Sequence, residues 1–144
     1  MKEEYVTYEQ AQALKRLGFS EETTHYYVHF KSDGEIKLWS CNPPDNHNAR
    51  LSINEVCSAP RLDQAQKWLR EKGIHISVNP YMSYDVDADG ELYNEYPSWG
   101  FELMDVASAD FMNDAGGNHT SYELALSAGI DAALELLTDK LNDK

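Results

Sequence analysis

Apolar residues recur at helical spacing in three segments of the chain, and the first two segments have clear end signals. The first follows Thr7, which forms a capping box with Gln10, and it ends at Gly18, a residue suited to a left-handed helix cap. The second ends at Gly73 in the same way. Its apolar stripe predicts one buried helix face, formed by Leu62, Ala65, Trp68 and Leu69.

The third helical segment lies near the C-terminus, and Thr120 with Glu123 predicts its start as a second capping box. Gly129 costs about 1 kcal/mol relative to alanine inside a helix, so its place in the apolar face indicates a close approach to a sheet or another helix. The predicted face consists of Tyr122, Leu126, Gly129, Ile130, Ala133, Leu134 and Leu137.

Alternating apolar positions after each of the first two helices predict two β-hairpins. In the first hairpin, a three-residue loop of Ser32-Asp33-Gly34 would place Phe30 opposite Ile36 and Val28 opposite Leu38. In the second, a tip at Ala88-Asp89 would pair Ile74 with Leu103, Ile76 with Phe101, Val78 with Trp99, and Pro80 with Pro97. Pairing is expected to loosen at the two prolines, since neither has an N–H to donate.

Together these elements predict a single α+β domain over residues 1–144, with the order α-ββ-α-ββ-α. We expect the two antiparallel hairpins to form one sheet packed with three helices. Segments 41–60 and 105–119 are rich in turn-forming residues and are expected to be loops, the first with at most a short strand at 51–53. The predicted core contains Trp68, Ile76, Trp99, Phe101, Leu126 and Ile130.

Charge is distributed unevenly along the chain. No lysine or arginine occurs between Gly73 and Asp139, and this stretch holds 13 acids, whereas the other 12 acids equal all 12 bases and the net charge is −13. Such asymmetry governs long-range fields and the sign of a partner, not the fold. It favours a basic protein partner for the C-terminal half and disfavours direct binding of nucleic acid, whose phosphates would be repelled.

Length and hydropathy narrow the class of protein further. A chain of 144 residues fits one domain. No segment has the apolar run of a signal peptide or of a membrane-spanning helix, so we expect a cytoplasmic protein without membrane contact. Cys41 and Cys57 are therefore expected to be free thiols.

Asp85, Asp87, Asp89 and Gly90 match the opening of an EF-hand calcium loop. The twelfth position, which should hold a bidentate glutamate, is Tyr96, and the flanking segments are strand-like. An acidic hairpin turn explains the same residues, because aspartate and glycine favour turns. The plain turn is preferred, with a calcium-binding module as the alternative, and no metal or cofactor is assigned.

Other candidate chemistry is weaker. Cys41, His47 and Cys57, together with His25 or His29, lack the short ligand spacing of a structural zinc site. There is no Gly-x-Ser-x-Gly motif and no histidine is identified as the partner of a cysteine. We therefore expect a protein that is not an enzyme and has no catalytic residues, and a small hydrolase with an unrecognised site is the second alternative.

Two surfaces are candidates for binding. Tyr27, His29 and Trp39 are predicted to share the face of the first hairpin opposite Val28, where they either form an exposed aromatic strip or are covered by the N-terminal helix or a loop, which is the preferred interpretation. Glu123, Asp131, Glu135 and Asp139 are spaced at multiples of four on the last helix. Each like-charge pair destabilises a helix by about 0.2–0.5 kcal/mol, so this stripe is either a solubilising surface or a docking face for a basic protein.

Several strings of the sequence are similar to small proteins from phages and integrated mobile elements of gut Bacteroidetes. They are Ser40-Cys41-Asn42-Pro43-Pro44, Ala59-Pro60, residues 64–72 with Gly73-Ile74, Ser121-Tyr122-Glu123, Ala128-Gly129-Ile130 and Ala133-Leu134. The resemblance touches most of the chain and implies a cytoplasmic accessory protein without an assigned activity. It supplies no site residues, and the acidic tip at residues 85–94 is additional to it.

Overall fold

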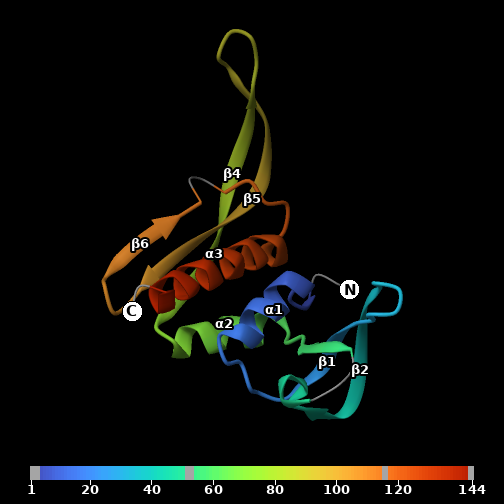
Figure 1. Cartoon of the computed structure of the whole chain (residues 1–144). Coiled ribbons are helices and arrows are strands. Elements are labelled where there is room, and N and C mark those ends of the chain that lie inside the picture. The colour runs from blue at the N-terminus through green and yellow to red at the C-terminus, as the bar shows by residue number, and fades with distance from the viewer. Residues whose placement is uncertain (1–3, 51–53, 115–116, 143–144) are drawn as a thin grey trace.

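The computed structural model describes residues 4–50, 54–114 and 117–142 (Figure 1). The short strand expected at 51–53 lies outside them. The elements, in chain order, are α1 (Tyr8–Arg16), β1 (Thr23–His29), β2 (Ile36–Asp45), the 3-10 turn η2 (His47–Ala49), β3 (Glu55–Ser58), α2 (Leu62–Glu71), β4 (Ile74–Val86), β5 (Leu92–Asp105), β6 (Asp110–Asn113) and α3 (Tyr122–Asn142).

The strands form two separate antiparallel sheets, in the orders β2-β1-β3 and β4-β5-β6, so the prediction of one sheet made from both hairpins is wrong. Each hairpin pairs with a third strand from a segment that was expected to be a loop. β3 occupies the free edge of β1, and β6 occupies the edge of β5 near its end. The two hairpins are not paired with each other, and the helices lie between the sheets (Figure 1).

The end signals of the first two helices are confirmed. Thr7 accepts a hydrogen bond from Gln10 N, and the Gln10 side chain accepts one from Thr7 N. Gly18 and Gly73 have φ values of 96° and 90°, in the left-handed region. The third start is one residue later than predicted: Leu124 N donates to Ser121 Oγ and Ala125 N to Ser121 O, so Ser121 caps α3 in place of Thr120.

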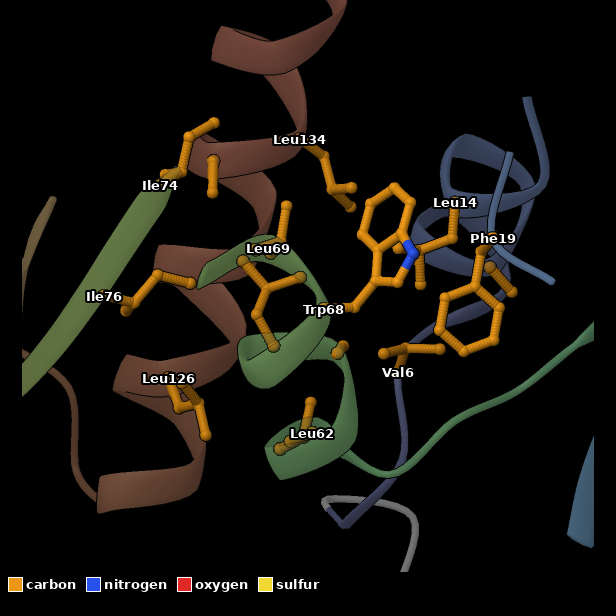
Figure 2. Close-up of a cluster of buried hydrophobic side chains, with 14 of the residues drawn as sticks. Val6, Leu14, Phe19, Leu62, Trp68, Leu69, Ile74, Ile76, Leu126 and Leu134 are labelled. Atoms are coloured by element: carbon orange, nitrogen blue, oxygen red, sulfur yellow. The ribbon is translucent and has the colours of Figure 1, made fainter. Parts of the chain in front are cut away.

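One contiguous hydrophobic cluster joins the two halves of the chain (Figure 2). It gathers side chains from α1, α2, α3 and both sheets, among them Val6, Leu14, Phe19, Leu62, Trp68, Leu69, Ile74, Ile76, Leu126 and Leu134. Five of the six predicted core residues are buried: Trp68, Ile76, Phe101, Leu126 and Ile130. Trp99 is half-buried, with the edge of its ring against Tyr122.

The close approach predicted at Gly129 is confirmed. A Cβ atom at this position would lie 2.8 Å from Ile76 Cγ2 and 3.3 Å from Phe101 Cβ. Only a glycine lets the α3 backbone pack this tightly on β4 and β5, which explains a glycine inside a long helix.

The predicted register of the first hairpin is wrong by one residue. Phe30 N donates to Glu35 O, so the turn contains four residues, and Val28 lies opposite Lys37 while Tyr27 lies opposite Leu38. A slip of one residue exchanges the faces of one strand relative to the other. Trp39 consequently shares a face with Val28, and the predicted strip of Tyr27, His29 and Trp39 is divided between two faces of the sheet.

The register of the second hairpin is wrong by two residues, which preserves the predicted faces. Ile76 lies opposite Leu103 and Val78 opposite Phe101. The tip has three residues, because Asp87 N donates to Glu91 O and Gly90 adopts a φ of 83°. An extra residue on β5 near Asn94, whose φ is 53°, accounts for the remaining difference.

Candidate functional site: an exposed acidic arm

The outer halves of β4 and β5, with the turn between them, form a two-stranded projection that we term the arm (residues 80–97). Figure 1 shows the arm extending away from the three helices. Pairing continues through it, from Pro80 opposite Trp99 to Val86 opposite Leu92.

Pairing does not loosen at Pro80 and Pro97, contrary to the prediction. The backbone groups of both prolines are directed away from the other strand of the hairpin. Trp99 exchanges two backbone hydrogen bonds with His119, so Trp99 and Pro97, two residues away, direct their backbone groups away from β4. On β4, the Ile76 carbonyl accepts a hydrogen bond from Gln66 Nε2, which places Ile76 and Pro80 in the same outward orientation. Neither proline therefore costs a bond between the strands.

One side of the arm carries large apolar side chains in contact with solvent. We define the arm face as Met82, Tyr84, Val86 and Leu92, which are 51%, 42%, 60% and 62% exposed. By strand alternation, this face is the outward continuation of the side on which Ile74, Ile76 and Val78 face the core. Helix α3 covers that side only as far as Trp99, whose ring contacts Tyr122 at the start of the helix.

The opposite side of the arm is partly covered near its base. Tyr81 lies over Gly100, whose hypothetical Cβ would be 2.8 Å from the Tyr81 ring and 2.8 Å from Gly117 Cα. Ser98 Oγ is 2.8 Å from Ser83 Oγ and donates to Gly117 O. The segment around Gly117 thus packs on this side at the base of the arm, whereas Tyr93 and Tyr96 farther out are 53% and 40% exposed. Among the described residues, only the arm face is uncovered along its whole length.

The excess of acidic over basic residues is most concentrated in the arm. The arm contains Asp85, Asp87, Asp89, Glu91 and Glu95 and no lysine, arginine or histidine. At the tip, Asp87 Oδ1 accepts hydrogen bonds from the backbone N–H groups of Asp89 and Glu91, each at 2.9 Å. Asp85 Oδ2 accepts one from Asn94 Nδ2.

These contacts are those of a capped acidic turn. Asp87 stabilises the turn itself, and Asp85 lies on a strand opposite Tyr93. Within the described ranges, no group of three or more histidine, cysteine, aspartate or glutamate side chains could hold a metal ion. The carboxylates of Asp85, Asp87 and Asp89 therefore do not converge as an EF-hand loop requires.

Some of the other acids in the C-terminal half have partners that can form hydrogen bonds or ion pairs with them. Lys140 Nζ donates to both carboxylate oxygens of the buried Asp105, at 3.0 and 2.8 Å, and this hydrogen bond is the main cause of a lowered Asp105 pKa. His119 Nε2 is 3.3 Å from Asp114 Oδ2. The acids that remain without such pairing are concentrated in the arm and on α3.

The stripe on α3 is exposed, as predicted, at Glu123, Asp131, Glu135 and Asp139. One member has a structural contact, because Gln10 Nε2 on α1 donates to Asp131 Oδ1. The stripe borders a groove between α1 and α3 that also contains Arg16. It presents charge beside a helix contact, without the large exposed apolar side chains of the arm.

The cysteine and histidine candidates come together only in part. Cys41 Sγ lies 3.3 Å from His47 Nε2, a contact that the sequence did not reveal. The same nitrogen is 3.1 Å from the Thr23 carbonyl, which can only accept, so Nε2 carries the hydrogen. His47 therefore cannot take a proton from Cys41 through this nitrogen, and its burial lowers its pKa.

Cys57 lies apart from that pair and is not a reactive thiol. It is buried beneath α1, and burial raises its pKa to about 11 despite the nearby Lys15 ammonium. A thiol with this pKa is protonated at neutral pH and is a poor nucleophile and metal ligand.

Tyr27 and His29 are covered by α1, as the preferred interpretation predicted. The Tyr8 hydroxyl contacts His29 Nδ1 and donates to Glu55 Oε2, each at 3.3 Å, and the Tyr8 ring packs edge-on against Tyr27. A hydrogen bond between Glu55 and His29 is the main cause of a lowered Glu55 pKa. Burial is the main cause of a raised Tyr8 pKa. Beside this cluster lies a cavity of about 220 Å³, lined by Tyr8, Gln12, Lys15, Arg16, Glu55, Val56 and Cys57.

The arm face was missed by the sequence interpretation, which treated residues 80–97 as a weakly paired tip. A usable signal was present. The alternation of Ile74, Ile76 and Val78 continues in phase through Met82, Tyr84 and Val86, beyond the length that the predicted third helix could cover.

No family model, no curated protein and no solved structure matches this chain. Across residues 4–50, 54–114 and 117–142, no helix combines the length and apolarity needed to cross a bilayer.

Proposed function

We propose that this chain is a non-enzymatic interaction protein whose acidic C-terminal half binds a basic protein. The observation that carries the proposal is the arm, whose arm face has four large apolar side chains at least 42% exposed and which contains five acids and no base. Contiguous apolar side chains in solvent are a recurrent feature of protein-binding sites. The surrounding carboxylates favour a basic partner and oppose nucleic acid.

The arm fits this role better than the α3 stripe does. Charged residues at the rim of an interface mainly affect the association rate and its salt dependence, whereas buried apolar and aromatic anchors supply most of the binding energy. The arm has both kinds of residue, and the stripe has mainly charge. We therefore assign docking to the arm and long-range attraction to the whole C-terminal half, including the stripe.

The biological setting of the proposal is a cytoplasmic accessory role in a phage or an integrated mobile element. Its support is the similarity of the strings in segments 40–44, 59–74 and 121–134 to small proteins of such elements. A partner would then be a basic protein of the element or of its host.

The test is affinity capture from host lysate at low and moderate salt, followed by binding measurements with the purified partner. Wild type is compared with an arm variant, Asp85→Asn/Glu91→Gln/Glu95→Gln, which leaves the turn cap Asp87 intact. A stripe variant, Glu123→Gln/Asp131→Asn/Glu135→Gln/Asp139→Asn, removes a similar charge elsewhere.

We expect the arm variant to lose affinity and much of its salt dependence, and the stripe variant to lose less affinity, only as far as its association rate falls. Recovery of the same partners by all three proteins, with unchanged salt dependence, would lead us to abandon the proposal.

A further inference from the structure

We infer that the arm face binds a basic amphipathic helix, laid along the same side of the sheet that α3 covers. This inference rests on the proposed function and specifies how its partner is held. The observation that carries it is that the apolar side of β4 and β5, on which α3 packs, continues along the arm beyond the first residue of α3.

The packing of α3 shows what this side of the sheet accepts. The helix runs from Tyr122, whose ring contacts Trp99, to Lys140, which binds Asp105 at the far end of β5. Between these points it packs closely on Ile76 and Phe101. The arm face continues the same side beyond Trp99, so a second helix would meet a surface of the same kind.

The dimensions of the arm suit a short helix. The seven residues from Pro80 to Val86 extend over about 20 Å at the usual rise of a strand. A helix of about 14 residues has the same length and would present an apolar stripe of about four turns.

The prolines argue against a partner that adds a strand to the arm. Pro80 and Pro97 occupy outward-facing positions, one on each strand, where an added strand would need an N–H group. Proline at an edge position blocks such pairing. Recognition of the arm is therefore directed to its faces, and the arm face is the one that the described residues leave uncovered from the base of the arm to its tip.

Charge argues against a second copy of this chain as the occupant. Each arm carries five carboxylates and no base, so two arms packed face to face would bring like charges together at short range. A helix with apolar residues on one side and lysine or arginine on its flanks would instead be attracted by the field of these acids while it covers the arm face, although Asp85 lies on the other side of the arm with Tyr93.

The probe for this inference is a labelled peptide of about 14 residues, made of leucine and lysine in equal numbers at helical spacing. A second peptide has the same composition with leucine and lysine strictly alternating, as a strand requires. A third replaces lysine by glutamate at helical spacing. Fluorescence anisotropy measures the binding of each peptide to the full chain.

Matched variants locate the binding surface. Tyr84→Thr/Leu92→Thr changes the arm face, and Tyr93→Thr/Tyr96→Thr removes two exposed aromatic residues from the other side of the arm. Threonine keeps β-propensity in both cases. Thermal unfolding verifies that each variant is folded, and sedimentation establishes its oligomeric state.

We expect the basic helical peptide to bind more tightly than the alternating and acidic peptides. The arm-face variant should weaken it by about tenfold or more, as loss of interface anchors does, and the control variant by less than about twofold. Tighter binding of the alternating peptide, equal binding by both variants, or no binding of the basic helical peptide overturns the inference. A wild-type dimer that the arm-face variant abolishes also overturns it, in favour of a second copy.

Failure of this inference is distinguishable from failure of the proposed function. The captured basic partner can bind wild type with arm-dependent affinity although the helical peptide does not, and then only the mode of docking is wrong. If no partner depends on the arm charges, the proposed function itself is wrong.

Discussion

Substitution of Gly129 by alanine tests the closest contact between α3 and the second sheet. In an exposed helix this change stabilises a protein by about 1 kcal/mol, because alanine is the better helix former. Here the new Cβ would lie 2.8 Å from Ile76 Cγ2 and 3.3 Å from Phe101 Cβ. Overpacking of a dense core typically costs about 1–3 kcal/mol, so we expect a net loss of about 1 kcal/mol.

Urea unfolding, followed by far-ultraviolet circular dichroism, measures this difference directly. A lower midpoint with an unchanged slope indicates lost stability without a change in the surface exposed on unfolding. The melting temperature should fall by about 2–4 °C for a chain of this size.

A double-mutant cycle with Ile76→Ala identifies the clash as the cause. Ile76→Ala alone should cost about 2–5 kcal/mol, since it opens a cavity in the core. It also removes Cγ2, so the combined loss should be smaller than the sum of the two single losses. A Gly129→Ala variant that is more stable than wild type, or strictly additive costs, would refute the packing argument.

Two further predictions concern charged groups. Millimolar calcium should leave the melting temperature of wild type and of Asp85→Asn/Asp87→Asn/Asp89→Asn unshifted beyond the effect of ionic strength, because Asp87 caps the turn and the three carboxylates do not converge; a calorimetric isotherm with one defined site would contradict this. The Lys140 hydrogen bond lowers the Asp105 pKa below its ordinary value of 3.8, so its contribution is present above that pH and is lost as pH falls through the folded-state pKa. The stability difference between wild type and Asp105→Asn should therefore shrink below about pH 4.

Local signals in the sequence were sufficient for the helices and for much of the core. The helix ends are set by contacts within a few residues, at Thr7 with Gln10, at Gly18 and at Gly73. Gly129 is unfavourable in a helix, and this indicated that α3 packs closely on its neighbours. These effects depend on the nearest turn of chain or on one packing position, which is why a single sequence exposes them.

Strand pairing could not be predicted equally well, because it depends on residues far apart in the chain. The first hairpin slipped by one residue when the turn used Lys31 as a fourth loop residue. β3 and β6 have four residues each and carry no strong alternation of their own. They become strands because β1 and β5 offer them an edge.

The candidate site was predictable in charge but not in shape. The run of acids from Asp85 to Glu95 was evident, whereas the exposure of Tyr84 and Leu92 depends on where α3 begins relative to Trp99. That distance follows from tertiary packing. Periodicity extends the apolar side through Val86, but it does not indicate which part of that side the helix covers.

The exposure of the arm face also has a consequence for the evolution of this sequence. Side chains such as Val86 and Leu92, more than half exposed in the folded chain, lose little water on folding, so replacing them costs little stability. Core positions such as Ile130 have no such freedom, because any change of size disturbs a packed interior. The sequence of the arm can therefore diverge toward new partners while the body that carries it stays the same.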